Sequence, residues 1–470
     1  MADAEALPGA RGRPGRHGQA RRPREGPSLR WWLQHRLWIP PAVGAALGAC
    51  LGVLFVTPSP TVARVLSGLA WNATAAEARG MLSAVLGVAL TSLSIVLSLS
   101  MLVVQSAAGQ YSPRLLRLYL HSAGIRVVIP VFVATSVFCV VAAQAFGFVS
   151  ELERAPRPAL SLAMLLLIAC EGALVFQVLQ TLQLMRVENL VRQVRHGTLA
   201  AARRLERFRS ADLEVPAPPR ARTEAPGKVW PIRVQEDGFI ASVDAKALLE
   251  VATANQLTLH LERAVGEPVI QGEEVGWFEA PARGPAPRHE HIAARLRGAI
   301  HLDRWRDADR DVALGVRQLV DVAIKALSPG INDPYTAVEA VDQLTFLLCE
   351  LSRMHLGPRV LADASGAPRV FLRGPGLRDY LALATDQILR YGAAEPAVVL
   401  RLLRLAAAVG QRAREPEDRR AARELLHSIL TVAEPARAGA PDASVLRRHA
   451  EALEQALGGG PWPPLPAIGF

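Results

Sequence analysis

Four long apolar runs dominate the first half of the chain. They are free or nearly free of charged residues and cover 37–56, 81–104, 127–149 and 159–185. A helix needs about 20 apolar residues to cross the hydrocarbon core of a bilayer, and each run meets that length. Residues 37–209 are therefore predicted to form a four-helix transmembrane domain, the first part of an α-helical integral membrane protein.

The second run carries a stripe of small and polar side chains. At 100° per residue, its members fall within one arc of about 80° on a helix. They are Gly80, Ser83, Gly87, Thr91, Ser94, Ser98 and Gln105. Small residues let two helices approach closely, and hydroxyls can bond across the contact, so tight packing is the favoured interpretation. Hydroxyls aligned along a span could also line a wet path for ions or solutes, which is the second hypothesis.

Glu171 lies near the middle of the fourth run. A carboxyl group at that depth costs about 2.5–3.5 kcal/mol, so we expect it to face the interior of the bundle. No lysine or arginine occurs inside a span, so its expected partners are hydroxyls of the second span or Gln144 of the third. Two interpretations stay open: a proton or cation site, and a neutral, hydrogen-bonded structural carboxyl.

A small β-rich module is predicted over residues 228–280, after a linker at 210–227 rich in Pro, Ala and Arg. Apolar and polar residues alternate on both sides of Gly238, which predicts a β-hairpin over 228–244. Asp244 is expected to cap a short helix over 245–255, and residues 257–278 read as strands.

Residues 288–460 are predicted to form a mostly α-helical cytoplasmic domain, with helices over 312–327, 336–351, 377–391, 395–409, 416–433 and 443–457. In the first of these, apolar residues form one stripe. On its opposite face Arg317, Asp321 and Lys325 follow each other at a spacing of four residues, which favours ion pairs.

The turn after that helix is a candidate binding motif. Asn332, Asp333 and Pro334 are turn-forming residues, and Ser328, Gly330, Tyr335 and Thr336 flank them. The turn could bind a cation or a phosphate. The favoured alternative is that proline and glycine shape a corner between two helices and that the Asn and Asp side chains cap it.

Charge distribution changes the meaning of the net charge of +10. Residues 1–209 hold 22 basic and 9 acidic side chains, whereas residues 210–470 hold 31 and 34. The second half therefore lacks the basic surface of a nucleic-acid-binding domain.

Arginine in the flanks of the spans predicts the orientation. The flanks at 1–36, 105–126 and 186–209 hold eighteen arginines, against four in the two intervening loops. By the positive-inside rule both termini are expected in the cytoplasm of a bacterial inner membrane. Residues 1–36, rich in Arg, Gly and Pro, are expected to form a disordered basic arm.

No catalytic motif stands out. The sequence contains no P-loop, dinucleotide fingerprint, nucleophile elbow or paired CxxC, so no enzyme activity and no cofactor are predicted. His289, Glu290 and His291 fall in an expected loop without a further ligand at useful spacing, so no metal site is predicted. The four cysteines are scattered and read as small apolar residues.

Four segments carry a family resemblance: QSAAGQYSPRLLR at 105–117, GVRQLVDVA at 315–323, SPGINDPYTA at 328–337 and DQILRY at 386–391. Together they resemble the bacterial predicted-membrane-protein family called domain of unknown function 2254, in the same order over roughly residues 30–430. The resemblance implies a multi-span membrane protein and no particular activity.

The leading functional hypothesis is a homo-oligomeric channel or transporter-like protein with a cytoplasmic regulatory domain. It rests on the polar stripe and on Glu171, because a pore forms more easily between small four-span subunits than inside one. The expected partners are the lipid bilayer, further copies of the chain and a small ion or solute. The alternative is a membrane-anchored sensor or scaffold whose cytoplasmic domain binds a ligand or partner of unknown kind.

Overall fold

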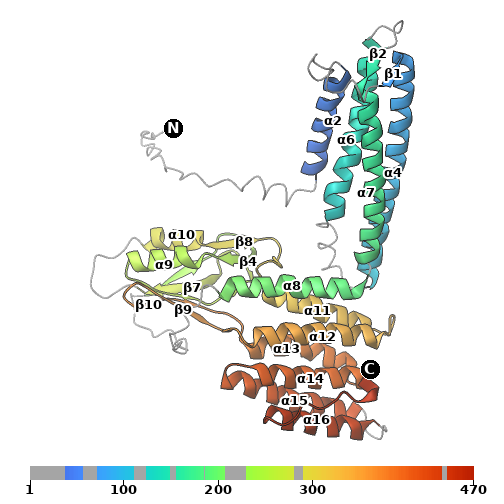
Figure 1. Cartoon of the computed structure of the whole chain (residues 1–470). Helices are drawn as coiled ribbons and strands as arrows, with labels where there is room; N and C mark the ends of the chain where they lie inside the picture. Colours follow the sequence, from blue (N-terminus) through green and yellow to red (C-terminus); the bar gives the residue numbers. More distant parts are fainter. Residues whose placement is uncertain are drawn as a thin grey trace, which may run out of the picture. The chain divides into compact units, whose positions relative to one another are not determined.

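A computed structural model describes most of the chain (Figure 1). The expected arm at 1–36 and the expected linker at 210–227 lie outside the described part. The described residues are 38–56, 71–110, 123–148, 155–184, 186–206, 229–279, 289–436 and 442–469. The chain divides into an N-terminal unit, residues 1–97 with 121–177, and a C-terminal unit, residues 98–120 with 178–470.

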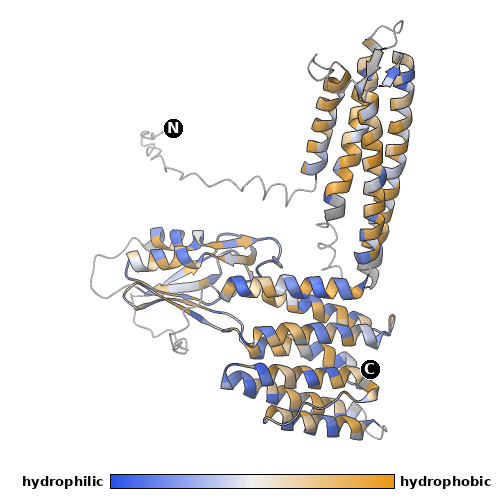
Figure 2. Ribbon diagram, in the orientation of Figure 1, coloured by the Kyte–Doolittle hydropathy of each residue, from blue (hydrophilic) through white to orange (hydrophobic). Residues whose placement is uncertain are grey.

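Four described helices are long and apolar enough to cross a membrane, as predicted. They are α2 (Ile39–Val56), α4 (Ala75–Gln110), α6 (Ala123–Ala145) and α7 (Pro158–Leu184). Most of their residues are hydrophobic (Figure 2). A short strand before α4, β1 (Trp71–Ala73), pairs antiparallel with β2 (Ala155–Arg157) just before α7.

A seam of glycines joins α2 to α6. Gly44, Gly48 and Gly52 recur every four residues on α2, and all three are buried. A Cβ added at Gly44 would lie 2.6 Å from the carbonyl oxygen of Pro130, and one at Gly48 would lie closer still to the carbonyl oxygen of Ala134. Glycine therefore lets the backbones of α2 and α6 touch. This close packing through small residues was expected for the second span, α4, and is found on the first span, α2.

The rest of the N-terminal unit is held together by apolar side chains from α4, α6 and α7. They form two buried clusters, and the largest fully buried side chains in them are Phe132 and Phe138 of α6. Phe146, in the 3-10 turn η2 (Phe146–Phe148) that follows α6, closes one cluster. Aromatic rings thus fill the described interior of this bundle.

Two sheets form the β-containing part of the C-terminal unit. The five-stranded sheet has the order β3 (Val229–Arg233), β7 (Glu274–Glu279), β5 (Thr258–Leu261), β10 (Pro368–Leu372) and β9 (Arg359–Ala362). All its neighbours are antiparallel except β5 and β10. The three-stranded antiparallel sheet has the order β6 (Pro268–Val269), β4 (Gly238–Val243) and β8 (Ile300–Asp303). α9 (Ala245–Ala254) and α10 (His289–Gly298) pack with both sheets in one apolar core.

The observed topology contradicts the hairpin prediction, and the two sheets include strands from beyond the predicted β-rich module at 228–280. β3 and β4 are consecutive in sequence but pair in different sheets, so they form no hairpin. Three strands, β8, β9 and β10, come from the region expected to be helical, and the expected loop at His289 begins α10. The error arises because strand pairing depends on distant partners: Leu361 and Val370 complete the core of the earlier strands.

Seven helices form the rest of the C-terminal unit among the described residues. They stack in successive layers (Figure 1). They are α8 (Val187–Glu206), α11 (Val312–Ala326), α12 (Pro334–Leu351), α13 (Leu377–Gly392), α14 (Pro396–Arg412), α15 (Pro416–Ala436) and α16 (Ala443–Leu457), with a short 3-10 turn η3 (Ala467–Gly469) after them. The six helices predicted from residue 312 onward are present.

α8 belongs to this stack although it lies within the range predicted for the transmembrane domain. Its buried residues Leu190, Val191 and Val194 join the core formed with α11 and α12. Gly315 of α11 faces Thr198 of α8 so closely that a Cβ would overlap the threonine side chain. The amphipathic pattern of α8 is thus satisfied by protein contacts.

His260 of β5 is a buried ionisable group in the five-stranded sheet. Its ring is stacked between Trp277, 3.9 Å away, and Phe371, 4.5 Å away. Burial lowers the pKa of His260 from 6.5 to about 4. The unfolded chain therefore binds this proton more readily than the folded chain between those two pH values.

We predict that replacing Gly48 by Ala destabilises the N-terminal unit by about 1–3 kcal/mol, because the added methyl group overpacks the contact with α6. The thermal midpoint of the detergent-purified protein should fall by several degrees. Gly172→Ala is the matched control, since its Cβ meets no atom within 4 Å. Equal midpoints for Gly48→Ala and wild type would contradict the close contact.

We predict that acid destabilises the C-terminal unit through His260. The stabilising contribution is complete above pH 6.5, falls as the pH is lowered and is lost below about pH 4, and is on the order of 3 kcal/mol. His260→Phe preserves the stack and cannot titrate, so its thermal midpoint should fall less between pH 7.5 and 4.5 than that of wild type. His196→Phe, at an exposed position, should keep the wild-type slope, and equal slopes for all three proteins would refute the assignment.

Candidate functional site

Glu171 of α7 is hydrogen-bonded to the second span at a residue outside the predicted stripe. The hydroxyl of Ser92 on α4 donates to its Oε1 at 3.3 Å. Ser92 is buried, at 6% exposure, whereas Glu171 is exposed on the N-terminal unit. Gln144, the other expected partner, is exposed on α6. A second-span hydroxyl therefore does bind the carboxyl group, as expected.

The expectation that Glu171 faces the interior of the bundle is wrong for the single chain. On α7 the buried residues Ala163, Cys170 and Gln177 recur every seven residues on one face. Glu171 lies about 100° around the helix from that face, at its edge. Glu171 lies near the middle of α7, but the interior face of α7 depends on which neighbours the helix meets.

The stripe on α4 is named the polar face: Ser83, Thr91, Ser94, Ser98 and Gln105, with Gly80 and Gly87. All seven residues are exposed. A Cβ at either glycine would meet no atom within 4 Å. The buried residues of α4 include Leu82, Val85, Ala89 and Val96, and they lie about 170° around the helix from the polar face. Within one chain, therefore, the polar face packs against no other described helix.

Part of the polar face satisfies its own hydrogen bonds. The hydroxyl of Thr91 donates to the carbonyl oxygen of Gly87 at 2.9 Å, one turn earlier. Such a bond lets a hydroxyl lie in apolar surroundings. An ionised carboxylate has no comparable partner on its own helix backbone, because the carboxylate and the helix carbonyls both only accept hydrogen bonds. Glu171 is therefore harder to accommodate in apolar surroundings than the Thr91 hydroxyl.

The turn at 328–336 is held by local hydrogen bonds. Asp333 caps α12: its Oδ1 accepts from the backbone N–H of Thr336 at 3.1 Å and its Oδ2 from the Thr336 hydroxyl at 2.6 Å. Asn332 adopts a φ of +51°, a left-handed conformation that asparagine tolerates. The Ser328 hydroxyl donates to the carbonyl oxygen of Lys325 at 2.6 Å. These hydrogen bonds are the ones expected if the turn is a capped corner between α11 and α12.

The remaining residues of the motif do not converge on one point. Tyr335 is 63% exposed, and a Cβ at Gly330 would meet no atom within 4 Å. Arg317 and Asp321 form the expected ion pair along α11, with Nε and Oδ1 3.1 Å apart. Nothing in the described contacts distinguishes this corner as a ligand site.

His289, Glu290 and His291 lie in the first turn of α10. Among the residues that the structure describes, no group of three or more His, Cys, Asp or Glu side chains is arranged to hold a metal ion.

A cavity in the C-terminal unit was missed from the sequence. It measures about 420 Å³ and is lined by α8, by the ends of β4, β5 and β10, and by the start of α11. Five arginines line it: Arg204, Arg263, Arg310, Arg359 and Arg373. They come from separate segments of the chain, so no local sequence spacing could predict that they line one cavity.

One family match covers most of both units, up to residue 408. The family described as "Predicted membrane protein (DUF2254)" matches residues 34–408. The chain is also 29% identical over 426 residues to "Uncharacterized protein Rv1290c" of Mycobacterium tuberculosis, a match that covers 90% of this chain and 81% of that protein. "Uncharacterized protein Mb1321c" of Mycobacterium bovis matches to the same extent. No solved structure matches the chain. The family match spans the four candidate membrane helices, both sheets and most of the helical stack, and the chain therefore belongs to the family of predicted membrane proteins called DUF2254.

Proposed function

We propose that this protein is a homo-oligomer of the bacterial inner membrane whose subunits meet along the polar face of α4, and that the assembly is a channel or transporter-like path. One observation carries the proposal: the polar face of α4 and Glu171 of α7 are exposed. Most of the other residues of the four candidate spans are hydrophobic (Figure 2).

The first step concerns the cost of leaving Glu171 in lipid. A carboxyl group near the middle of a span costs about 2.5–3.5 kcal/mol, and Ser92 supplies a single hydrogen bond to it. A second copy, or water held between copies, removes the carboxyl from lipid. The free energy recovered in this way favours association of subunits.

The second step concerns the shape of the polar face. Gly80 and Gly87 leave open space on α4, and Ser83, Ser94 and Ser98 carry small side chains. Helices in membranes associate through such surfaces, since small residues permit close approach and hydroxyls bond across the contact. The described helices of the chain leave this surface uncovered, so an identical helix of another subunit is its simplest partner.

The third step concerns where an ion or solute would cross. Within one chain the described interior is filled by Phe132, Phe138 and neighbouring apolar side chains. Ser92 and Thr135 are buried, but the polar face of α4 and Glu171 lie on the outside. The proposed hydrated path therefore lies between subunits, with the hydroxyls of α4 and Glu171 as its lining.

The orientation follows from the arginine-rich flanks. Eighteen arginines flank the spans on one side, against four on the other. By the positive-inside rule this proposal places both termini and the C-terminal unit in the cytoplasm. There the C-terminal unit would regulate the path.

We predict that Ser94→Cys forms a disulfide-linked dimer under mild oxidation in membranes, because the polar faces of two copies would be in contact. The background carries Cys50→Ala, since Cys50 is the exposed cysteine among the described residues. Leu54→Cys, an exposed position on α2, is the control and should remain monomeric. Cross-linking at Leu54 and not at Ser94 would place the interface elsewhere.

We predict that the purified protein in liposomes carries a cation flux, measured for H⁺, Na⁺ and K⁺ under imposed gradients. Glu171→Gln should reduce that flux by about tenfold, the equivalent of about 1.4 kcal/mol at the crossing point. Glu451→Gln, an exposed residue of α16, is the matched control and should conduct as wild type does. A wild-type protein that is oligomeric and passes none of these cations would overturn the transport proposal.

A further inference from the structure

The cavity of the C-terminal unit lies where several elements end or begin. α8 forms one wall, β4 leads into α9 at another, and the loop before α11 forms a third. The segments that follow α12 and β10 complete it, with Tyr380 of α13. At about 420 Å³ the cavity falls within the range of small-molecule sites in proteins, which is about 300–1,000 Å³.

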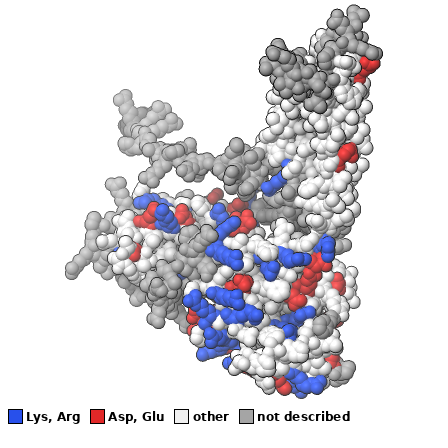
Figure 3. Space-filling model, viewed as in Figure 1, with Lys and Arg blue, Asp and Glu red and all other residues white. Residues whose placement is uncertain are grey.

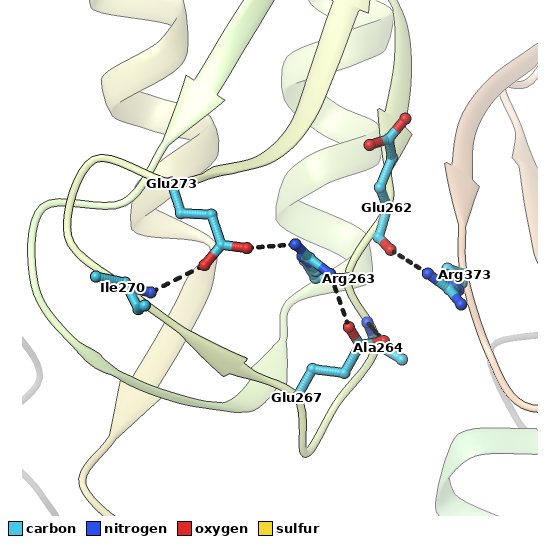
Figure 4. Close-up of polar contacts among 7 residues, drawn as sticks. All are labelled: Glu262, Arg263, Ala264, Glu267, Ile270, Glu273 and Arg373. Carbon is cyan, nitrogen blue, oxygen red and sulfur yellow. Dashed lines mark hydrogen bonds and ion pairs between the residues drawn. The ribbon is translucent and has the colours of Figure 1, made fainter. Parts of the chain in front are cut away.

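Two of its five arginines already have acidic partners. Arg263 is held between Glu267, with Nη1 and Oε2 3.4 Å apart, and Glu273 (Figure 4). Arg310 lies 3.8 Å from Asp307. The charge of these two arginines is balanced within the chain.

The other three arginines have no such balance. Within the described part of the chain, no carboxylate lies at ion-pair distance from Arg204, Arg359 or Arg373. Arg204 donates to the backbone carbonyl oxygen of Asp309 at 3.1 Å, and Arg373 donates to that of Glu262 at 3.3 Å (Figure 4). Backbone carbonyls orient a guanidinium without cancelling its charge.

Arg359 is the least satisfied of the three. Its Nε is buried and has no hydrogen-bond partner among the described residues. Burial lowers the pKa of its guanidinium, with the Tyr380 phenol as the neighbour that opposes this effect. A buried donor without a partner is unfavourable, and an anion in the cavity would supply an acceptor for it.

The acidic residues that line the cavity are mostly committed elsewhere. Asp244 caps α9 through the backbone N–H of Ala247. Asp311 caps α11 and is paired with Arg306, at 2.7 Å between Oδ2 and Nε. Only Asp309 offers a carboxylate without a described partner, and it is exposed. The lining therefore keeps a net positive charge.

We propose that this cavity binds a small water-soluble organic phosphate. Arginine is suited to phosphate, since its planar fork of donors matches the oxygens of the group and its charge is permanent. Three unpaired guanidiniums offer more donors than the two oxygens of one carboxylate can accept, whereas a phosphate monoester presents three terminal oxygens. The cavity exceeds the size of the phosphate group itself, and Leu205, Val265, Met354 and Leu372 give it an apolar wall for an organic body.

This inference does not depend on the transport proposal. The site is built entirely from residues of the C-terminal unit, and either proposal can fail without the other. If both hold, the bound phosphate is the signal to which the cytoplasmic part responds.

The test is equilibrium dialysis of the full-length protein in neutral detergent at low salt, with radiolabelled pyrophosphate as the probe. We expect one saturable site per chain, with AMP and ribose 5-phosphate displacing the probe and uncharged ribose failing to do so. Arg373→Gln and Arg204→Gln should each weaken binding by about tenfold, because each removes a charge-assisted contact. Both side chains are exposed, so these variants are expected to fold.

Two further variants separate the site from charge in general. Arg359→Lys keeps the charge but loses the planar set of guanidinium donors, so it should also weaken binding. Arg448→Gln removes an exposed arginine of α16 that does not line the cavity, so it should leave binding unchanged. Absence of saturable binding would overturn the proposal, as would wild-type affinity in Arg204→Gln and Arg373→Gln. Displacement by citrate more readily than by the phosphate esters would overturn the assigned ligand class.

Discussion

Close contact between backbones, made possible by glycine, determines how the N-terminal unit is assembled. In lipid there is no gain from hiding apolar side chains from water, so helices associate where their surfaces fit closely. α2 meets that condition through Gly44, Gly48 and Gly52, which touch the carbonyl groups of α6. With α2 on α6 and with apolar clusters joining α4, α6 and α7, the polar face of α4 is left on the outside.

That arrangement places two similar-looking stripes in different roles. The glycines of α2 are buried and make an intramolecular contact, whereas Gly80 and Gly87 of α4 have open space around them. Both stripes are small residues at helical spacing. The difference lies in what each helix meets, and it is the reason that the polar face is exposed within one chain whereas the glycines of α2 are buried.

The C-terminal unit depends on contacts between distant parts of the chain. β10 adds to β5 across more than a hundred residues, and β8 adds to β4 across about half that distance. These pairings bring Arg359 and Arg373 to the same cavity as Arg263 and, through α8, Arg204. On the face that Figure 3 shows, basic and acidic residues of this unit are mixed, so the cavity is distinguished by the arginines that lack an acidic partner.

Much of the local structure was accessible from the sequence alone. Run length and absence of charge identified the four candidate spans, apolar periodicity identified the helices from residue 312 onward, and Asp244 was recognised as a cap. These features depend on residues within a few turns of each other, which is why composition and spacing suffice. Only the tertiary structure decided the sheet partners of β3 and β4, the exposure of Glu171 and the polar face, and the arginine-lined cavity. Each of these depends on which distant surfaces meet, because the free energy of burial and pairing is settled by the neighbours that the fold brings together.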